Sequence, residues 1–265
     1  MKKYGKEIAI LVLFALACVV LVVFEYCISF TDDQSLDAMI RGTVSRMIAF
    51  ALLLPAVWLS GCRSALSPKT SWRALLWCLP CLLVAICNFP IHEMLTGAAR
   101  VKEGAPVWLF ALECLSIGLL EELLFRGLLQ NLLFDLMKKQ GEIAAILVNS
   151  AAFGLWHLVN LLGGAGVGAT LMQVGYSFLF GAMLSCVLLR TGNIWTCVVL
   201  HTIFDFGGLL IVKLGEGVTQ DWVFWLLTAV AGVLCAAHAV IYVARREKQR
   251  RNKEAANPSP EGEGQ

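Results

Sequence analysis

Three charged side chains stand close together inside a long apolar stretch of the sequence. Glu121 and Glu122 are adjacent, and Arg126 follows Glu122 by four residues. Residues four apart share a face of a helix, so Glu122 and Arg126 can neutralise each other. Glu121 and Arg126 lie roughly 140° apart around a helix axis, which leaves Glu121 without a partner in its own helix. A carboxylate at bilayer depth costs several kcal/mol unless it is paired or hydrated, so Glu121 needs partners from other helices.

Two other polar motifs in apolar surroundings can supply those partners. The first is Phe153-Gly-Leu-Trp-His157, followed by Asn160, and the second is His201-Thr-Ile-Phe-Asp205. In each motif the two end residues are four apart and share a helix face. Phe153 can therefore pack along the imidazole of His157. Asp205 can hold one nitrogen of His201 and set its tautomer, or act beside it.

Together these residues suit the hydrolysis of a carbonyl compound. A desolvated Glu121 can act as general base toward a water molecule, while one imidazole orients that water and the other stabilises the oxyanion. Alternatively, Glu121, His157 and His201 form a zinc-binding set with water as the fourth ligand. The soluble zinc-protease motif HExxH does not occur. The residues leave both mechanisms open.

The composition requires these residues to lie in a membrane protein. Of 265 residues, 58% are hydrophobic and 15% are charged, against about 25% charged in soluble domains. Apolar runs of spanning length predict an all-α, polytopic membrane protein with about eight transmembrane helices and a polar catalytic cavity among helices four to seven. The runs are 8–30, 44–60, 75–92, 107–136, 142–161, 170–190, 193–212 and 222–244. Pro80 and Pro90 interrupt the third run, which can be kinked or partly re-entrant.

Basic residues mark alternate ends of these runs. They precede the first run, follow the second, fourth and sixth, and cluster after the eighth, whereas the other connections are acidic or mixed. The positive-inside rule then places both termini in the cytoplasm. The basic residues are Lys2, Lys3, Lys6, Arg63, Lys69, Arg73, Lys138, Lys139, Arg190 and those of the run 245–253. Because that last run directly follows a span, it indicates a membrane anchor and no nucleic-acid partner.

The predicted spans divide the chain into four parts. Residues 1–106 hold the first three helices, 107–212 the catalytic core of helices four to seven, 213–244 the last helix, and 245–265 a basic, disordered cytoplasmic tail. The ten cysteines are interpreted as packing residues in helices, rather than as a disulfide framework or a zinc knuckle.

The three motifs, in this order and inside apolar helices, resemble a known family of intramembrane proteases. This is the type II CAAX prenyl endopeptidase and bacteriocin-processing (CPBP or Abi) family, whose pattern is EExxxR, then FxxxH, then HxxxN or HxxxD. The resemblance covers roughly residues 107–208. It implies an intramembrane endopeptidase in which Glu121 is the catalytic glutamate, His157 helps it activate water, and His201 and Asp205 bind the oxyanion or the substrate carbonyl. The residues to which it gives supporting roles are Glu122, Arg126, Phe153 and Asn160.

Asp205 departs from the asparagine that eukaryotic members carry at this place. An ionised aspartate has no proton to donate to an oxyanion, so Asp205 orients His201, binds a metal or stays protonated. The departure favours a bacterial-type member in the plasma membrane whose substrate is a peptide or a protein associated with the lipid bilayer. Two other functions fit the composition: a non-proteolytic immunity or scaffold protein of the same family, and a proton-coupled transporter. The first three spans carry no counterpart of the polar motifs, which disfavours the transporter.

Overall fold

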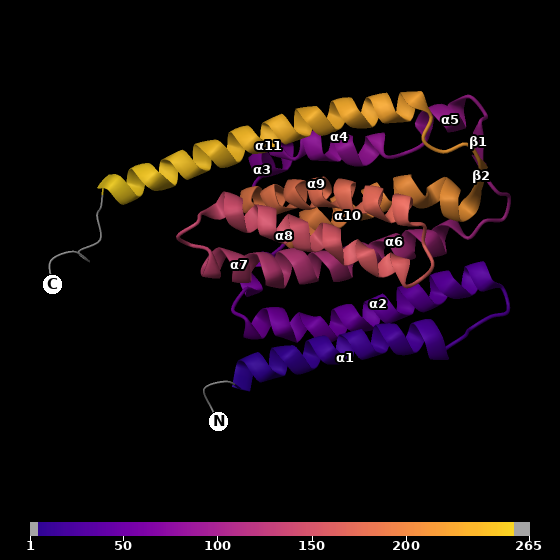
Figure 1. Ribbon diagram of the computed structural model, residues 1–265, viewed down its shortest axis with the longest axis horizontal. Coiled ribbons are helices and arrows are strands. Elements are labelled where there is room, and N and C mark those ends of the chain that lie inside the picture. Colours follow the sequence, from indigo (N-terminus) through magenta and orange to yellow (C-terminus); the bar gives the residue numbers. More distant parts are fainter. Residues whose placement is uncertain (1–4, 257–265) are drawn as a thin grey trace.

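The computed structural model describes residues 5–256, and most of them are helical (Figure 1). Lys2, Lys3 and the last nine residues of the predicted tail, 257–265, lie outside the described residues. Six of the described helices are long and apolar enough to cross a membrane. They are α1 (Gly5–Cys27), α2 (Gln34–Leu59), α8 (Glu142–Trp156) with the 3-10 turn His157–Leu161, α9 (Val167–Thr191), α10 (Ile194–Leu214) and α11 (Trp222–Ala256). The prediction of a polytopic helical membrane protein is confirmed.

The predicted third span is broken into short pieces. It consists of α3 (Trp72–Trp77), α4 (Leu79–Cys87) and α5 (Ile91–Leu95). Pro80 stands in the first turn of α4 and Pro90 directly precedes α5, because a proline lacks the amide hydrogen that a continuing helix needs. None of the three pieces is among the candidate spans. The described part of the chain therefore gives six candidates and does not establish the predicted eight.

The predicted fourth span is one helical run whose geometry changes in the middle. α6 (Val107–Glu122) passes into a π-helical segment, Leu123–Leu129, and then into α7 (Gln130–Leu136). This run also lies outside the six candidates. It carries the charged residues from which the functional prediction starts.

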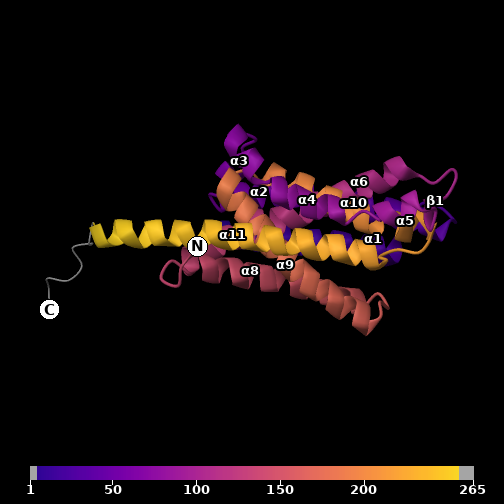
Figure 2. The same cartoon turned by 90° about the horizontal axis from the view of Figure 1, so that it is seen from above.

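The central helices are covered on both sides (Figure 1). α1 and α2 pack together along one side of the bundle, and α4 and α11 lie along the other. Seen from above, α8 and α9 lie on the opposite side of α11 from α4 and α10 (Figure 2). A buried apolar cluster that includes Leu53, Val57, Leu123, Phe153 and Leu184 fills the middle. The helices with the polar motifs therefore lie inside the bundle.

A two-stranded antiparallel sheet lies at one end of the bundle. β1 (Ala99–Val101) pairs with β2 (Gly215–Gly217), and Arg100 stands opposite Glu216. Arg100 Nη2 and Glu216 Oε1 form an ion pair of 2.5 Å. The sheet joins the connection before α6 to the connection after α10. It therefore holds these two helices together at this end.

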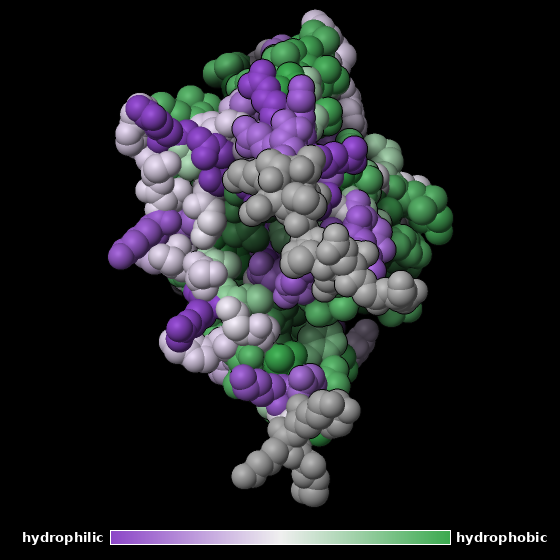
Figure 3. Space-filling model, turned by 90° about the vertical axis from the view of Figure 1, so that its left-hand side faces the viewer, coloured by the Kyte–Doolittle hydropathy of each residue, from purple (hydrophilic) through white to green (hydrophobic). Residues whose placement is uncertain are grey.

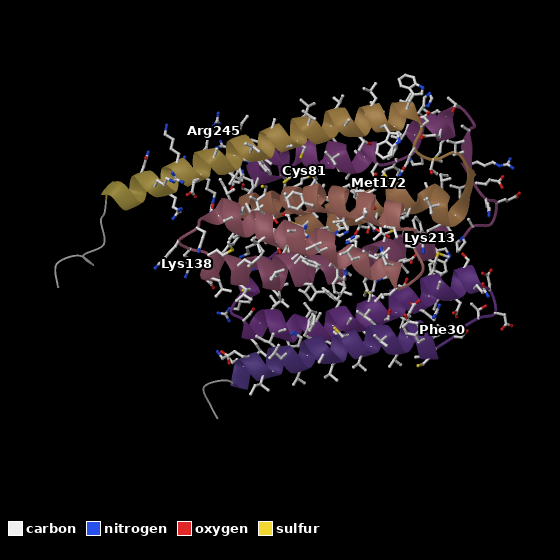
Figure 4. The ribbon with its side chains drawn as sticks, viewed as in Figure 1. Phe30, Cys81, Lys138, Met172, Lys213 and Arg245 are labelled. Atoms are coloured by element: carbon white, nitrogen blue, oxygen red, sulfur yellow. The ribbon has the colours of Figure 1, made fainter. Side chains whose placement is uncertain are left out.

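Basic side chains lie at the other end. Lys138, after α7, and Arg245, in the last part of α11, are at the same end, away from Lys213 and Phe30 (Figure 4). The face of the molecule at that end carries many hydrophilic side chains among the apolar ones (Figure 3). The basic connections after the fourth run and after the last run thus share one end of the bundle.

α11 is longer than the sequence predicts. The sequence places the end of this helix near residue 244 and a disordered tail after it, but the helix continues to Ala256. Arg246 Nε lies 2.6 Å from Glu142 Oε2 of α8, and Arg250 Nη2 lies 2.7 Å from Glu247 Oε1. Ion pairs of this kind favour a charged helix where the apolar run has ended.

Candidate active site

The candidate residues lie at the change of helix geometry in the α6–α7 run. Glu122 is the last residue of α6, and Arg126 lies within the π-helical segment. π-helical turns are rare and are frequent at functional sites. They displace backbone carbonyls from their α-helical partners. The side-chain amide of Asn131 donates to two of these carbonyls, Arg126 O (3.1 Å) and Gly127 O (2.9 Å), and so stabilises the irregular turn.

Glu122 and Arg126 form the ion pair that their spacing predicts. Arg126 Nη1 donates to Glu122 Oε1 over 3.0 Å, and neither side chain is exposed. The guanidinium also donates to Gly181 O (3.2 Å), and its carbon Cζ lies 4.5 Å from the centre of the Phe153 ring. Buried charges are tolerated only with such compensation. A carboxylate, a carbonyl and an aromatic ring therefore fix Arg126.

His201 connects this ion pair to the other two carboxylates. Its Nδ1 lies 2.6 Å from Glu122 Oε1, so Glu122 accepts hydrogen bonds from both Arg126 and His201. Because an ionised carboxylate only accepts, Nδ1 carries a proton. The other ring nitrogen, Nε2, lies 3.4 Å from Asp205 Oδ2 and 3.7 Å from Glu121 Oε2. The sequence suggests Asp205 as the residue that orients His201, whereas the structure gives the shorter contact to Glu122.

Phe153 and His157 adjoin the same group of side chains. The Phe153 ring meets His157 edge to face, with 5.2 Å between the ring centres, and meets His201 in the same way at 5.9 Å. Nδ1 of His157 lies 3.2 Å from Phe153 O. Since a carbonyl oxygen can only accept, Nδ1 carries the proton and Nε2 is unprotonated in the neutral ring. The phenylalanine therefore packs on the histidine as predicted, and its backbone sets the tautomer.

Asn160 makes its hydrogen bond away from the carboxylates. Its Nδ2 donates to Gln173 Oε1 of α9 over 2.8 Å, which ties the 3-10 turn to α9. The other predicted site residues form one connected group through the contacts described above. They are Glu121, Glu122, Arg126, Phe153, His157, His201 and Asp205.

Two glycines allow the helices to approach closely enough for these contacts. A Cβ on Gly118 of α6 would lie 3.0 Å from Thr202 Oγ1 and 3.2 Å from Val198 O, both in α10. A Cβ on Gly181 of α9 would lie 3.0 Å from Phe153 Cδ1. Larger side chains at these places would push α6 away from α10, or α9 away from α8. Gly118 thus supports the contact between Glu122 and His201, and Gly181 supports the packing of α9 on Phe153.

Glu121 has an oxygen that the surrounding side chains leave without a hydrogen bond. Within the described part of the chain, Glu121 Oε2 is buried and has no hydrogen-bond partner. A buried polar atom of this kind calls for a water molecule or a ligand group as its partner. The side chain as a whole is 16% exposed, although Oε2 itself is buried. A water molecule or a substrate atom can therefore meet Glu121 beside Nε2 of His201.

The predicted zinc ligands do not stand as a ready set. Among residues 5–256, no three histidine, cysteine, aspartate or glutamate side chains are arranged to hold a metal ion. In each imidazole Nδ1 is engaged, in His201 by Glu122 and in His157 by Phe153 O, which leaves Nε2 as the nitrogen that could bind a metal. A zinc ion on Glu121, His157 and His201 would require Nε2 of both histidines and a carboxylate oxygen of Glu121 to converge. The zinc site stays a prediction.

A buried amide network near the ion pair is absent from the motif-based prediction. Gln130 Nε2 donates to Ser185 O (3.2 Å), and Asn149 Nδ2 donates to Ser185 Oγ (3.2 Å). All three residues are buried, on α7, α8 and α9. The sequence does carry a signal for them, since amide side chains inside apolar runs commonly bond between membrane helices.

Glu113 is a further buried carboxylate of α6 and lies outside the three motifs. Its Oε1 lies 3.4 Å from Lys213 Nζ of α10 and 3.8 Å from Arg46 Nη1 of α2. It stands eight residues before Glu121, about two helical turns away. The cluster joins three helices near the site. The sequence does carry a signal for Glu113, because an ionisable residue inside a predicted span is rare and commonly functional.

The fold and these contacts define a class, namely a polytopic helical membrane protein with carboxylates and imidazoles buried among its helices. The family model described as Rce1-like, type II CAAX prenyl endopeptidase Rce1-like, matches residues 103–207. These residues contain all three motifs, so the family model matches the part of the chain that carries the predicted resemblance. No curated protein and no solved structure matches the chain.

Proposed function

We propose that the protein is an intramembrane endopeptidase that hydrolyses a peptide bond in a peptide or a membrane-associated protein. The observation that carries the proposal is the position of His201, with Glu122 on one ring nitrogen and Glu121 and Asp205 beside the other. A purely structural ion pair would need Glu122 and Arg126 only. Such a pair does not explain why two more carboxylates, Glu121 and Asp205, and the imidazole of His201 lie beside it. A site that activates water accounts for all of them.

Glu121 is the general base in this mechanism. Its free oxygen takes a proton from water, and the hydroxide adds to the carbonyl carbon of the substrate. His157, whose Nδ1 is occupied by Phe153 O, presents Nε2 to orient that water. Glu121 then passes its proton to the leaving amine as the carbon–nitrogen bond breaks. One proton is thus moved from water to the amine, and Glu121 returns to its starting state.

His201 and Asp205 lie where the substrate carbonyl would be bound. Glu122 holds Nδ1 of His201 and so fixes the direction of Nε2. When the imidazole is protonated, Nε2–H can donate to the developing oxyanion. Asp205, 3.4 Å from the same nitrogen, favours that charged form. Arg126 balances the charge of Glu122.

The membrane arrangement that suits this function has both termini in the cytoplasm. The basic connections support it, because Lys138 and Arg245 share one end of the bundle. We place the protein in a bacterial plasma membrane, with the α3–α4 and α6–α7 segments as the two further crossings that would make eight. The substrate would reach the site among α6 to α10 from the lipid bilayer.

Hydrolysis in water enriched in oxygen-18 tests the proposed reaction. The purified protein, reconstituted in vesicles, is incubated with a library of peptides, and the products are identified by mass spectrometry. We expect new carboxyl termini that each carry one heavy oxygen atom, with a chelator and metal analysis deciding the part of zinc. Absence of any such product across peptide and membrane-protein substrates would contradict a peptidase and favour a binding role.

A further inference from the structure

Three cysteines lie together outside the candidate active site. Cys78 and Cys81 stand at the junction of α3 and α4 in the sequence Cys78-Leu-Pro-Cys81, which has the CxxC spacing found in thiol–disulfide exchange proteins. Sγ of Cys81 lies 3.7 Å from Sγ of Cys235 in α11, and these residues are only 1% and 3% exposed. Figure 4 shows Cys81 where α4 runs beside α11. The cysteines are free thiols in the structure. The interpretation of all cysteines as packing residues overlooks this spacing.

Cys78 differs from the other two because it borders a cavity. A cavity of 420 Å³ lies between the α3–α4 segment and the first half of α10, and its lining includes Cys78, Leu82, Thr196 and Leu200. The lining is largely apolar, so a small apolar molecule dissolved in the bilayer can occupy it. Cys78 is only 5% exposed, and its Sγ donates to Ala74 O over 3.3 Å. A disulfide in the cavity therefore meets this thiol at the cavity wall once that hydrogen bond is released, and Cys81 lies one helical turn further along the chain.

We propose that Cys78, Cys81 and Cys235 form a thiol–disulfide exchange site for small apolar disulfides. The thiolate of Cys78 attacks one sulfur of the disulfide and releases a first thiol, which leaves a mixed disulfide on Cys78. Cys81 then attacks Cys78 and releases the second thiol. Cys235 attacks Cys81 and frees Cys78. In sum, two protein thiols are oxidised, one disulfide molecule is reduced to two thiols, and the protons of the protein thiols pass to the leaving groups.

The final bond joins α4 to α11. The two sulfurs need to approach by about 1.6 Å to reach a bond length of about 2.05 Å, a shift that side-chain rotation can supply. α4 also packs against α10, the helix that carries His201 and Asp205. Asn88, directly after α4, donates to Phe204 O of α10 over 2.7 Å. Oxidation would therefore fix a helix that contacts α10 directly beside Asp205.

The test uses 4,4′-dithiodipyridine, a small apolar disulfide, on the purified full chain in lipid nanodiscs. Released thiopyridone is followed by absorbance, and disulfides are mapped by mass spectrometry after alkylation and proteolysis. We expect a Cys81–Cys235 disulfide in the unaltered chain, formed at least tenfold more slowly in Cys78→Ser. Cys81→Ser should retain a thiopyridine adduct on Cys78. The control is Cys87→Ser, on the same helix, which should form the disulfide at the unaltered rate.

Three results would overturn the proposal. The first is a folded chain that forms no Cys81–Cys235 disulfide. The second is a link from Cys235 to Cys186 in its place. The third is a link that forms equally fast in Cys78→Ser, with no adduct on Cys78 in Cys81→Ser, which would exclude the route through the cavity.

Discussion

Glu122 is the residue on which the geometry of the site depends. Its Oε1 accepts from Arg126 at 3.0 Å and from His201 at 2.6 Å, so one atom joins α10 to the π-helical segment. The motif spacing alone assigns Glu122 to Arg126. Its contact with His201 makes Glu122 a positioning residue for the imidazole.

Replacement of Glu122 by glutamine should destabilise the protein strongly. The amide is nearly isosteric, but it leaves the buried guanidinium of Arg126 without an opposite charge, and removing one member of a buried pair costs about 3–5 kcal/mol. The free energy of unfolding in detergent, followed by tryptophan fluorescence, measures the loss. The control is Glu103→Gln, because Glu103 is exposed. Equal stability of the two variants would show that the pair does not hold this part of the bundle together.

The approach of α6 to α10 is the feature of the elements that brings Glu122 onto His201. Gly118→Val should separate the two helices, since a Cβ there already meets Thr202 and Val198 at 3.0 and 3.2 Å. On the proposed function we expect peptide cleavage to fall by about tenfold to a hundredfold, the scale of small misplacements in active sites. Gly175→Val is the control, because a Cβ there meets nothing within 4 Å. Similar cleavage rates in both variants would argue against a need for the close approach.

Asp221 caps the start of α11, close in sequence to the end of the bundle that carries the sheet of β1 and β2. Its Oδ1 accepts from the backbone N–H groups of Val223 and Phe224 at 2.9 Å each, and its Oδ2 lies 2.5 Å from His92 Nδ1. The hydrogen bond from Phe224 N, with help from His92, holds the pKa of Asp221 below its usual range.

The stabilising effect of this cap should depend on pH. A lowered folded-state pKa means that the effect is complete above the unfolded value of about 3.9 and is lost as the pH falls through the lower folded value. Amide hydrogen-exchange protection at the start of α11, corrected for intrinsic rates, should fall in that acidic range. In Asp221→Asn, which cannot titrate, protection should stay flat. A fall of the same size in both proteins would assign the loss to other groups.

The structure shows which elements local sequence patterns can predict. Apolar runs and prolines predict most helices and the break in the third span, because both effects act within a few residues. The ion pair of Glu122 and Arg126 follows from helical spacing. The contact of Glu122 with His201 and the sheet of β1 with β2 depend on residues far apart in the sequence. The apolar pattern also does not predict the π-helical segment. The motifs therefore predict the contacts within one helix, such as those of Glu122 with Arg126 and of Phe153 with His157, but not the contact of Glu122 with His201 between helices.

For the whole molecule, the distribution of basic residues predicts one orientation in the membrane. Lys138 and Arg245 share one end, and Lys213 lies at the other. We expect a fluorescent reporter that folds only in the cytoplasm to be active when fused after Arg245 or inserted beside Lys138, and inactive beside Lys213. The opposite pattern would contradict the orientation, and activity at all three places would contradict a spanning arrangement between these ends.

The cleavage rate of Glu121→Gln shows whether Glu121 is the catalytic base. The substitution keeps the size of the side chain and removes the base, so the rate of peptide cleavage should fall by about 10²–10⁴-fold. The melting temperature should change little, because Glu121 Oε2 makes no hydrogen bond within the described chain and its contact with His201 Nε2 is 3.7 Å long. A folded Glu121→Gln protein that cleaves its peptide as fast as the unaltered chain would exclude Glu121 as the catalytic base.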